Sequence, residues 1–102
     1  MDRDQTKRIK EMESFLDESA EALKQLEAAL DAYEAAEDNY YKLDNYYGSS
    51  QWMADFEDDE AGRLPADLKR GVLSEDTVYD LICQHRELMR RMQKAVLRSL
   101  EE

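Results

Sequence analysis

The sequence has few of the residues that break helices or anchor common kinds of site. It contains one cysteine, one proline and three glycines. With Cys83 alone, neither an intrachain disulfide nor a metal site built on several cysteines can form. So few prolines and glycines leave few obligatory breaks, which favours long helices. No apolar run approaches the ~18 residues that a membrane span requires, so we expect a cytoplasmic protein with no membrane segment.

Positive charge is also scarce. Lys and Arg number 14 against 25 Asp and Glu, which gives a formal net charge of −11 at pH 7. Because affinity for phosphate comes from Lys and Arg, this balance disfavours binding to nucleic acid or to an anionic membrane surface. The ordinary interpretation of such charge is solubility, and the alternatives are a basic protein partner or mimicry of nucleic acid.

No group of residues in the sequence is typical of an enzyme. There is neither a Gly-rich phosphate loop nor a Ser-centred elbow. Cys83 and His85 lie two residues apart, so on a helix they point about 200° away from each other and cannot share a proton. With one His and one Cys, the usual zinc sites would need ligands from two subunits. We therefore expect a protein without enzymatic activity, cofactor or metal.

The first half of the chain has the spacing of one long helix. From Thr6 to Tyr47 there is neither Gly nor Pro, and apolar residues recur at steps of three, four and seven. The seven-residue spacing holds from Ile9 to Leu30 and fails at Glu37 and Asp44, which suits a helix packed within a bundle. We predict a helix over about residues 6–47, with Asp38-Asn39 as the place for a bend.

The centre of the chain, about residues 48–73, holds all three glycines and the proline. Ser49 or Ser50 can cap a short helix, and Gly62 is a fitting stop for it. The segment is too rich in large apolar groups for a flexible linker, and we expect an ordered clasp folded over the long helices. Those groups are Trp52, Met53, Phe56, Leu64 and Leu68.

A last helix is predicted over about residues 74–100. Ser74 can cap it, with Leu73 and Val78 placed as a hydrophobic staple around the cap. This helix should run antiparallel to the first. The predicted fold is all-α, an antiparallel bundle of two long helices with a short helical clasp between them, in a single domain over residues 1–102.

Residues in and around the clasp resemble those of a bacterial family of about this length, described only as a domain of unknown function. The resemblance spans nearly the whole chain and is densest from Tyr46 to Tyr79. It implies a small helical bacterial protein and supplies no activity, cofactor or site residue. The residues that carry it are Tyr46-Tyr47-Gly48-Ser49, Trp52, Asp55, Glu60, Gly62, Leu64-Pro65-Ala66-Asp67-Leu68-Lys69-Arg70-Gly71-Val72-Leu73-Ser74-Glu75-Asp76 and Val78-Tyr79.

The candidate binding residues are acidic and aromatic. The acidic run consists of the carboxylates between Asp55 and Glu60. It could be a solvated helix end, a protein-binding patch, or a set of oxygen ligands for Mg²⁺ or Ca²⁺, although it lacks the spacing of a calcium loop. Two tyrosines lie off the apolar stripe and could shape a recognition groove with the tryptophan, with packing inside the clasp as the alternative. The candidate partner-binding residues are Tyr41, Tyr46, Trp52, Asp55, Glu57, Asp58, Asp59 and Glu60.

A basic row also follows one face of the last helix. Its members repeat every four residues, and eleven acidic residues between Glu11 and Asp44 could pair with them inside the fold. We expect a small protein-binding or regulatory protein whose partner is an unidentified protein or a second copy of itself. The alternatives are a carboxylate metal-binding protein and an acidic mimic of nucleic acid. The basic row consists of Arg86, Arg90, Lys94 and Arg98.

Overall fold

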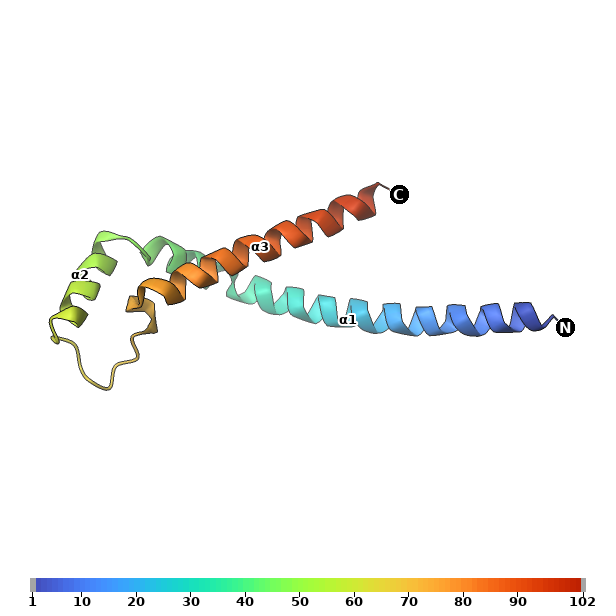
Figure 1. Ribbon diagram of the computed structural model, residues 1–102, viewed down its shortest axis with the longest axis horizontal. Coiled ribbons are helices and arrows are strands. Elements are labelled where there is room, and N and C mark those ends of the chain that lie inside the picture. Colours follow the sequence, from blue (N-terminus) through green and yellow to red (C-terminus); the bar gives the residue numbers. More distant parts are fainter. Residues whose placement is uncertain (1, 102) are drawn as a thin grey trace. The chain divides into compact units, whose positions relative to one another are not determined.

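The computed structural model describes residues 2–101, and these form helices and turns without any strand (Figure 1). Two long helices flank a short one, which confirms the predicted all-α architecture. The elements in chain order are α1 (Arg3–Tyr46), α2 (Ser50–Glu60), the 3-10 turn η1 (Gly71–Leu73) and α3 (Glu75–Leu100).

Helix α1 is unbroken from Arg3 to Tyr46, so Asp38-Asn39 does not interrupt it. The absence of Gly and Pro along this stretch explains why the backbone hydrogen bonds continue. The chain nevertheless divides into two compact units, Met1–Asn39 and Tyr40–Glu102, and the division falls inside this helix. We call them the N-terminal arm and the C-terminal unit.

The N-terminal arm consists of α1 alone, and none of its described residues is buried. The apolar stripe from Ile9 to Leu30, which we expected to be packed, is exposed because the arm holds no second element to cover it. Its larger side chains keep between 39% and 65% of their surface in contact with solvent. They are Ile9, Met12, Phe15, Leu16, Leu23, Leu26 and Leu30.

Local signals determine where the helices of the C-terminal unit begin and end. Helix α1 is followed by Gly48, whose φ of +80° is a conformation that favours glycine. Ser49 then caps α2, because its Oγ accepts a hydrogen bond of 3.1 Å from the backbone N–H of Trp52. Gly62, with φ +73°, ends α2, while the backbone N–H of Arg63 returns to the carbonyl of Asp58 at 2.9 Å. The predicted cap and stop of the short helix are both present.

The buried core of the described residues lies in the C-terminal unit and is small. It is formed by Trp52 of α2, Leu73 of η1, and Val78 and Ile82 of α3, each with at most 9% of its surface exposed. Leu73 precedes Ser74, which occupies the N-cap position of α3, and Val78 follows Ser74 by one turn, the positions of a hydrophobic staple. The predicted cap is wrong in its chemistry, because the Ser74 side chain makes no capping hydrogen bond with the described residues of α3. The clasp between the long helices is therefore ordered by burial of two of its own side chains, Trp52 and Leu73.

Two aromatic contacts give the direction in which the end of α1 meets the start of α3 within the C-terminal unit. The ring of Tyr40 stacks on His85, with centroids 4.1 Å apart. The hydroxyl of Tyr47 donates a hydrogen bond of 2.9 Å to the backbone carbonyl of Glu75. The later residue of α1 thus contacts the earlier residue of α3, because Tyr40 pairs with His85 and Tyr47 with Glu75. The two segments are therefore antiparallel here.

Candidate functional site

Tyr46 and Asp55 form a direct hydrogen bond between the end of α1 and α2. The Tyr46 hydroxyl donates to Oδ2 of Asp55 at 2.6 Å. This bond favours the neutral phenol and, with partial burial and the negative charge of Asp55, raises the pKa of Tyr46 to about 12. Both residues are candidates from the sequence, and the structure joins them by a hydrogen bond that connects α1 to α2.

Trp52, another candidate, lies in the core of the C-terminal unit. Only 7% of its surface is exposed, and its indole N–H donates a hydrogen bond of 2.9 Å to the backbone carbonyl of Val72. Its ring stacks on Phe56, with centroids 5.1 Å apart, and meets Tyr47 edge-on at 5.3 Å. The indole therefore packs inside the clasp, and its polar atom already has a partner.

Tyr41 is separated from this cluster. It is 47% exposed and lies edge-on to Tyr40, at 5.2 Å between ring centroids, and to His85 at 6.2 Å. A groove that joins Tyr41 to Trp52 is thus not formed by these contacts. Tyr41 instead extends an aromatic group at the antiparallel contact of α1 and α3, where burial first and the charge of Asp44 second raise the pKa of Tyr40.

The acidic run on α2 is divided between internal ion pairs and free carboxylates. Asp58 pairs with Arg63 at 2.9 Å, and Asp59 pairs with Arg70 at 2.5 Å. The first pair is open to solvent, with side chains 44% and 70% exposed, whereas the second is more sheltered at 18% and 35%. Pairing is therefore strongest at Asp59.

Arg70 anchors the loop after α2 as well as neutralising Asp59. Its guanidinium donates to the backbone carbonyls of Pro65 at 2.7 Å and Leu68 at 3.3 Å. One side chain therefore holds the irregular segment between α2 and η1 against the end of α2. The sequence shows that cations follow the acidic run. It does not show that the Arg70 guanidinium donates hydrogen bonds to three separate acceptors, the Asp59 carboxylate and the carbonyls of Pro65 and Leu68.

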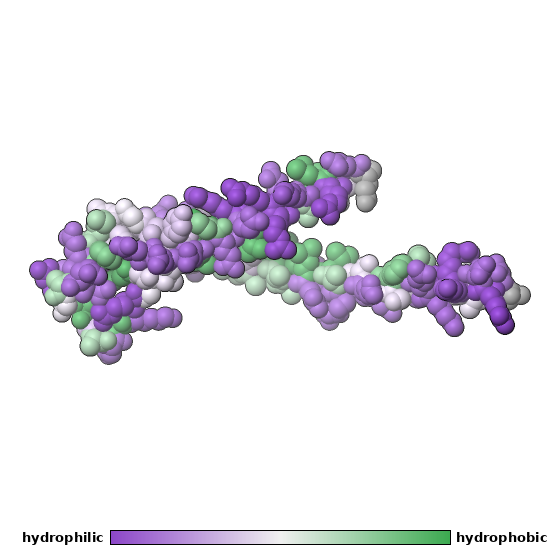
Figure 2. Space-filling view, viewed as in Figure 1, coloured by the Kyte–Doolittle hydropathy of each residue, from purple (hydrophilic) through white to green (hydrophobic). Residues whose placement is uncertain are grey.

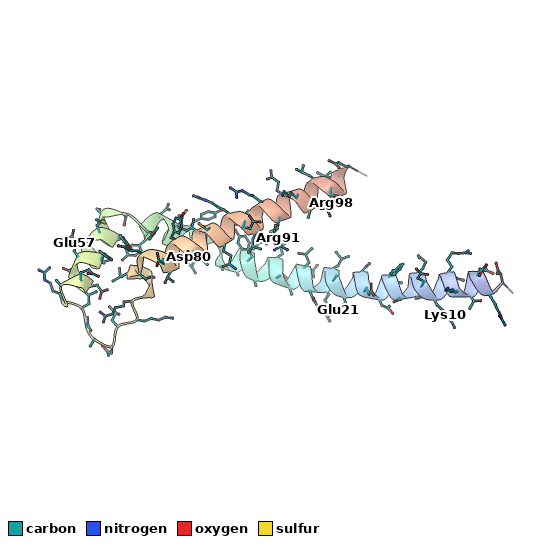
Figure 3. All side chains as sticks on the ribbon, in the orientation of Figure 1. Lys10, Glu21, Glu57, Asp80, Arg91 and Arg98 are labelled. Atoms are coloured by element: carbon teal, nitrogen blue, oxygen red, sulfur yellow. The ribbon has the colours of Figure 1, made fainter. Side chains whose placement is uncertain are left out.

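Glu57 and Glu60 are exposed, and neither forms an ion pair with another described residue. Figure 3 shows Glu57 projecting outward from α2. A hollow of about 430 Å³ beside Glu60 is also bordered by Glu75 and Asp76, with Arg70 in its wall. This acidic rim could accept a basic side chain from a partner.

Nothing in the described residues is arranged as a metal centre. Among residues 2–101 there is no group of three or more His, Cys, Asp or Glu side chains placed to hold an ion. The thiol of Cys83 is exposed and free, and its hydrogen bond with Tyr79 raises the pKa of that tyrosine. His85 belongs to the aromatic group with Tyr40 and Tyr41.

The basic row lies on α3, where Figure 3 labels one of its members, Arg98. Within the described part of the C-terminal unit, none of Arg86, Arg90, Lys94 and Arg98 forms an ion pair. The far half of α3 also exposes apolar side chains. These are Leu88, Met92, Val96, Leu97 and Leu100.

The candidate residues predicted from the sequence do not include any residue of the apolar stripe of the N-terminal arm, which is exposed. Figure 2 shows hydrophobic side chains at the surface along α1, between hydrophilic ones. A monomeric protein seldom exposes a long contiguous row of large apolar residues, so this row is a candidate contact surface. Its signal in the sequence is the seven-residue spacing from Ile9 to Leu30, which we interpret from the sequence as internal packing.

Among residues 2–101 no helix is both long and apolar enough to cross a membrane.

Comparison with known proteins gives a family and no activity. The family model described as "Domain of unknown function (DUF4298)" matches residues 9–95, and the chain therefore belongs to this family. The match includes nearly all of α1, the whole of α2 and most of α3. No curated protein and no solved structure matches the chain.

Proposed function

We propose that this member of the DUF4298 family is a non-enzymatic protein-binding protein, and that its binding surface is the apolar stripe of the N-terminal arm. The observation that carries the proposal is the exposure of seven large apolar side chains along one helix that has no buried residue. Helices in proteins gain most of their stability from packing an apolar face, so we expect another protein segment to pack on this one.

The amount of apolar surface on the stripe is large enough to support binding. Fully burying one Leu or Ile side chain contributes on the order of 1.5–3 kcal/mol. Because stripe residues are only partly exposed, with Leu23 at 65% and Leu30 at 39%, each would contribute a fraction of that. Even half of that amount over seven side chains offsets much of the roughly 4–15 kcal/mol that association costs.

The test is capture by the purified protein from its native cytoplasm, in the presence of a copy that carries a different tag. We expect wild type to capture the second copy or another protein. The double variant Leu16→Glu with Leu23→Glu should capture neither, because two charges would then be buried in the contact. The matched control is Glu21→Gln, which changes an exposed residue on the opposite side of the same helix. Equal capture by the double variant and wild type would overturn the proposal.

Mimicry of nucleic acid is a second candidate, and the exposure of the arm favours it. It requires the carboxylates of α1 to be accessible, and between Glu11 and Asp38 each is exposed except Glu37, which is half-buried. The target would be a basic site on a DNA-handling protein. In this case capture should persist in the Leu16→Glu, Leu23→Glu variant and decline steeply with added salt.

The proposed location is the cytoplasm. Cys83 carries a free, exposed thiol, and such thiols persist in reducing compartments. Fractionation of the native cells, followed by detection of the protein with an antibody, checks this assignment.

A further inference from the structure

We infer that the partner of the arm is the arm of a second copy of this chain, paired with it in antiparallel orientation. This inference rests on the proposed function, since it names the occupant of the same apolar stripe. Three observations lead to it, namely the reach of α3, the length of the stripe and the distribution of charge along the arm.

The chain's own α3 is too short to cover the arm. In the C-terminal unit, Tyr40 stacks on His85 and the two helices are antiparallel there. Helix α3 ends at Leu100, 15 residues beyond His85, whereas α1 extends 37 residues from Tyr40 back to Arg3. Both helices rise about 1.5 Å per residue, so the 15 residues of α3 beyond His85 can cover at most about 15 residues of α1 before Tyr40. Whatever its direction, α3 therefore cannot extend past about residue 25 of α1. About 33 Å of α1 is beyond it.

That uncovered length holds the densest part of the stripe. Ile9, Met12, Phe15, Leu16 and Leu23 all precede residue 25, and all are between 46% and 65% exposed. An element from outside this chain must therefore cover them. The stripe as a whole, from Ile9 to Leu30, extends over three seven-residue repeats, the length at which paired helices become stable.

Charge along the arm selects a second copy in reverse orientation. Residues 3–10 carry four cations, Arg3, Lys7, Arg8 and Lys10, against one carboxylate. Residues 31–38 carry four carboxylates and no cation. In a parallel pair each of these segments would face its own like-charged counterpart. In an antiparallel pair the basic segment of each copy faces the acidic segment of the other, at both ends of the contact.

The centre of the stripe allows the two helices to approach closely. The midpoint between Ile9 and Leu30 falls between Ser19 and Ala20, and a two-fold axis there would bring together these two small residues of both copies. With this axis, the basic residues at 3–10 lie level with residues 29–36 of the partner, which carry Asp31 and Glu34 and no cation. The symmetry that centres the apolar stripe thus also matches the charges.

The first test is sedimentation of the full chain over a dilution series. We expect wild type to be a dimer, and the Leu16→Glu, Leu23→Glu variant to dissociate roughly 100-fold more readily, because two apolar contacts per copy are replaced by charge. Glu21→Gln should sediment like wild type. Fluorescence of Trp52, which lies in the C-terminal unit, shows whether each variant remains folded there.

Charge reversal tests the orientation without touching the stripe. A variant in which Arg3, Lys7, Arg8 and Lys10 are all changed to Glu should be monomeric, since acidic segments would then face each other. Adding Asp31→Lys, Glu34→Lys, Glu37→Lys and Asp38→Lys to that variant should restore the dimer. A parallel pair would gain nothing from the second set of changes, so failure to restore the dimer would overturn the antiparallel arrangement.

The outcomes separate this inference from the proposed function. A wild-type protein that sediments as a monomer at all concentrations overturns self-pairing. If that monomer still captures a different protein through Leu16 and Leu23, the proposed function stands with another partner. A wild-type dimer that survives the two stripe substitutions overturns self-pairing through the stripe.

Discussion

The indole nitrogen of Trp52 and the backbone carbonyl of Val72 are joined by a hydrogen bond of 2.9 Å across twenty residues of sequence. This bond connects α2 to the 3-10 turn that precedes α3. The ring that makes it is also packed between Phe56 and Tyr47, so the same side chain holds together the clasp and the end of α1. Because Trp52 is the only tryptophan of the chain, its fluorescence reports on this junction alone.

Replacing the indole should therefore destabilise the C-terminal unit. We expect Trp52→Ala to lower the free energy of unfolding by about 3 kcal/mol, as large-to-small changes of buried aromatic residues do. Trp52→Phe keeps a ring but loses the bond to Val72, and should cost less, on the order of 1–2 kcal/mol. Urea unfolding followed by circular dichroism measures both. An unchanged midpoint in Trp52→Ala, with wild-type emission typical of indole in water, would contradict the packing of this ring.

The helix boundaries of this protein could be read from the sequence because local chemistry determines them. Ser49 caps α2 and Gly62 ends it, each within the reach of a few neighbouring residues. Ser74 occupies the N-cap position of α3, but its side chain makes no capping hydrogen bond there. The exception is the start of α1 at Arg3, three residues before the predicted position. Helix ends are the least certain part of such predictions, since adding one turn costs little free energy.

The tertiary bonds could not be predicted in the same way. The Tyr46–Asp55 and Tyr47–Glu75 bonds join residues on different elements, and no local spacing distinguishes them from other pairs. The arm shows a different difficulty. A stripe that packs inside its own chain and one that packs on a partner have the same spacing, so the exposure of Leu16 and Leu23 could not be predicted from the sequence alone.

The bond between Tyr46 and Asp55 predicts a dependence of stability on alkaline pH. The pKa of Tyr46 is raised to about 12 in the folded chain, above the value near 10 expected when unfolded. A group whose pKa is raised by folding stabilises the protein fully below its unfolded pKa and loses that contribution as pH rises to the folded one. Stability from this bond should therefore be complete below pH 10 and decline between about pH 10 and 12.

The matched variant for this prediction is Asp55→Asn, which keeps an oxygen acceptor and removes the charge. We expect it to lower the pKa of Tyr46, because part of the upward shift comes from the carboxylate's negative charge. Titration of the tyrosine ring carbons by NMR measures this, and Tyr46→Phe identifies the resonance. If Tyr46 titrated at the same pH in wild type and in Asp55→Asn, the negative charge of Asp55 would not contribute to its shift.

Arg70 and Arg63 provide a comparison between a tethering cation and a surface cation. Arg70 reaches Asp59, Pro65 and Leu68, and its pair with Asp59 is partly sheltered. Arg70→Ala should cost about 2 kcal/mol, since hydrogen bonds from a charged donor are the stronger ones. Arg63 forms one exposed pair, so Arg63→Ala should cost no more than about 0.5 kcal/mol. Thermal unfolding of the two variants checks the difference, and equal losses would show that Arg70 does not anchor the loop.

The two unpaired carboxylates of α2 give the last prediction, which separates a solvated surface from a binding surface. Glu57 and Glu60 lie in the last turn of α2, near the negative end of the helix dipole, and have no ion-pair partner among the described residues. Changing both to Gln removes repulsion and should raise the free energy of unfolding by about 0.3–1 kcal/mol per residue. Asp59→Asn is the control and should lower it, because that carboxylate is paired with Arg70.

The same double variant then decides whether the acidic run binds a partner. If Glu57 and Glu60 are only solvated, capture of a partner by the Gln variant should equal that of wild type despite the gain in stability. If they contact a basic partner, capture should fall while stability rises, since the loss of two charges weakens the contact and not the fold. A loss of stability in the Gln variant would mean that both carboxylates have internal partners, and the run would then serve the clasp alone.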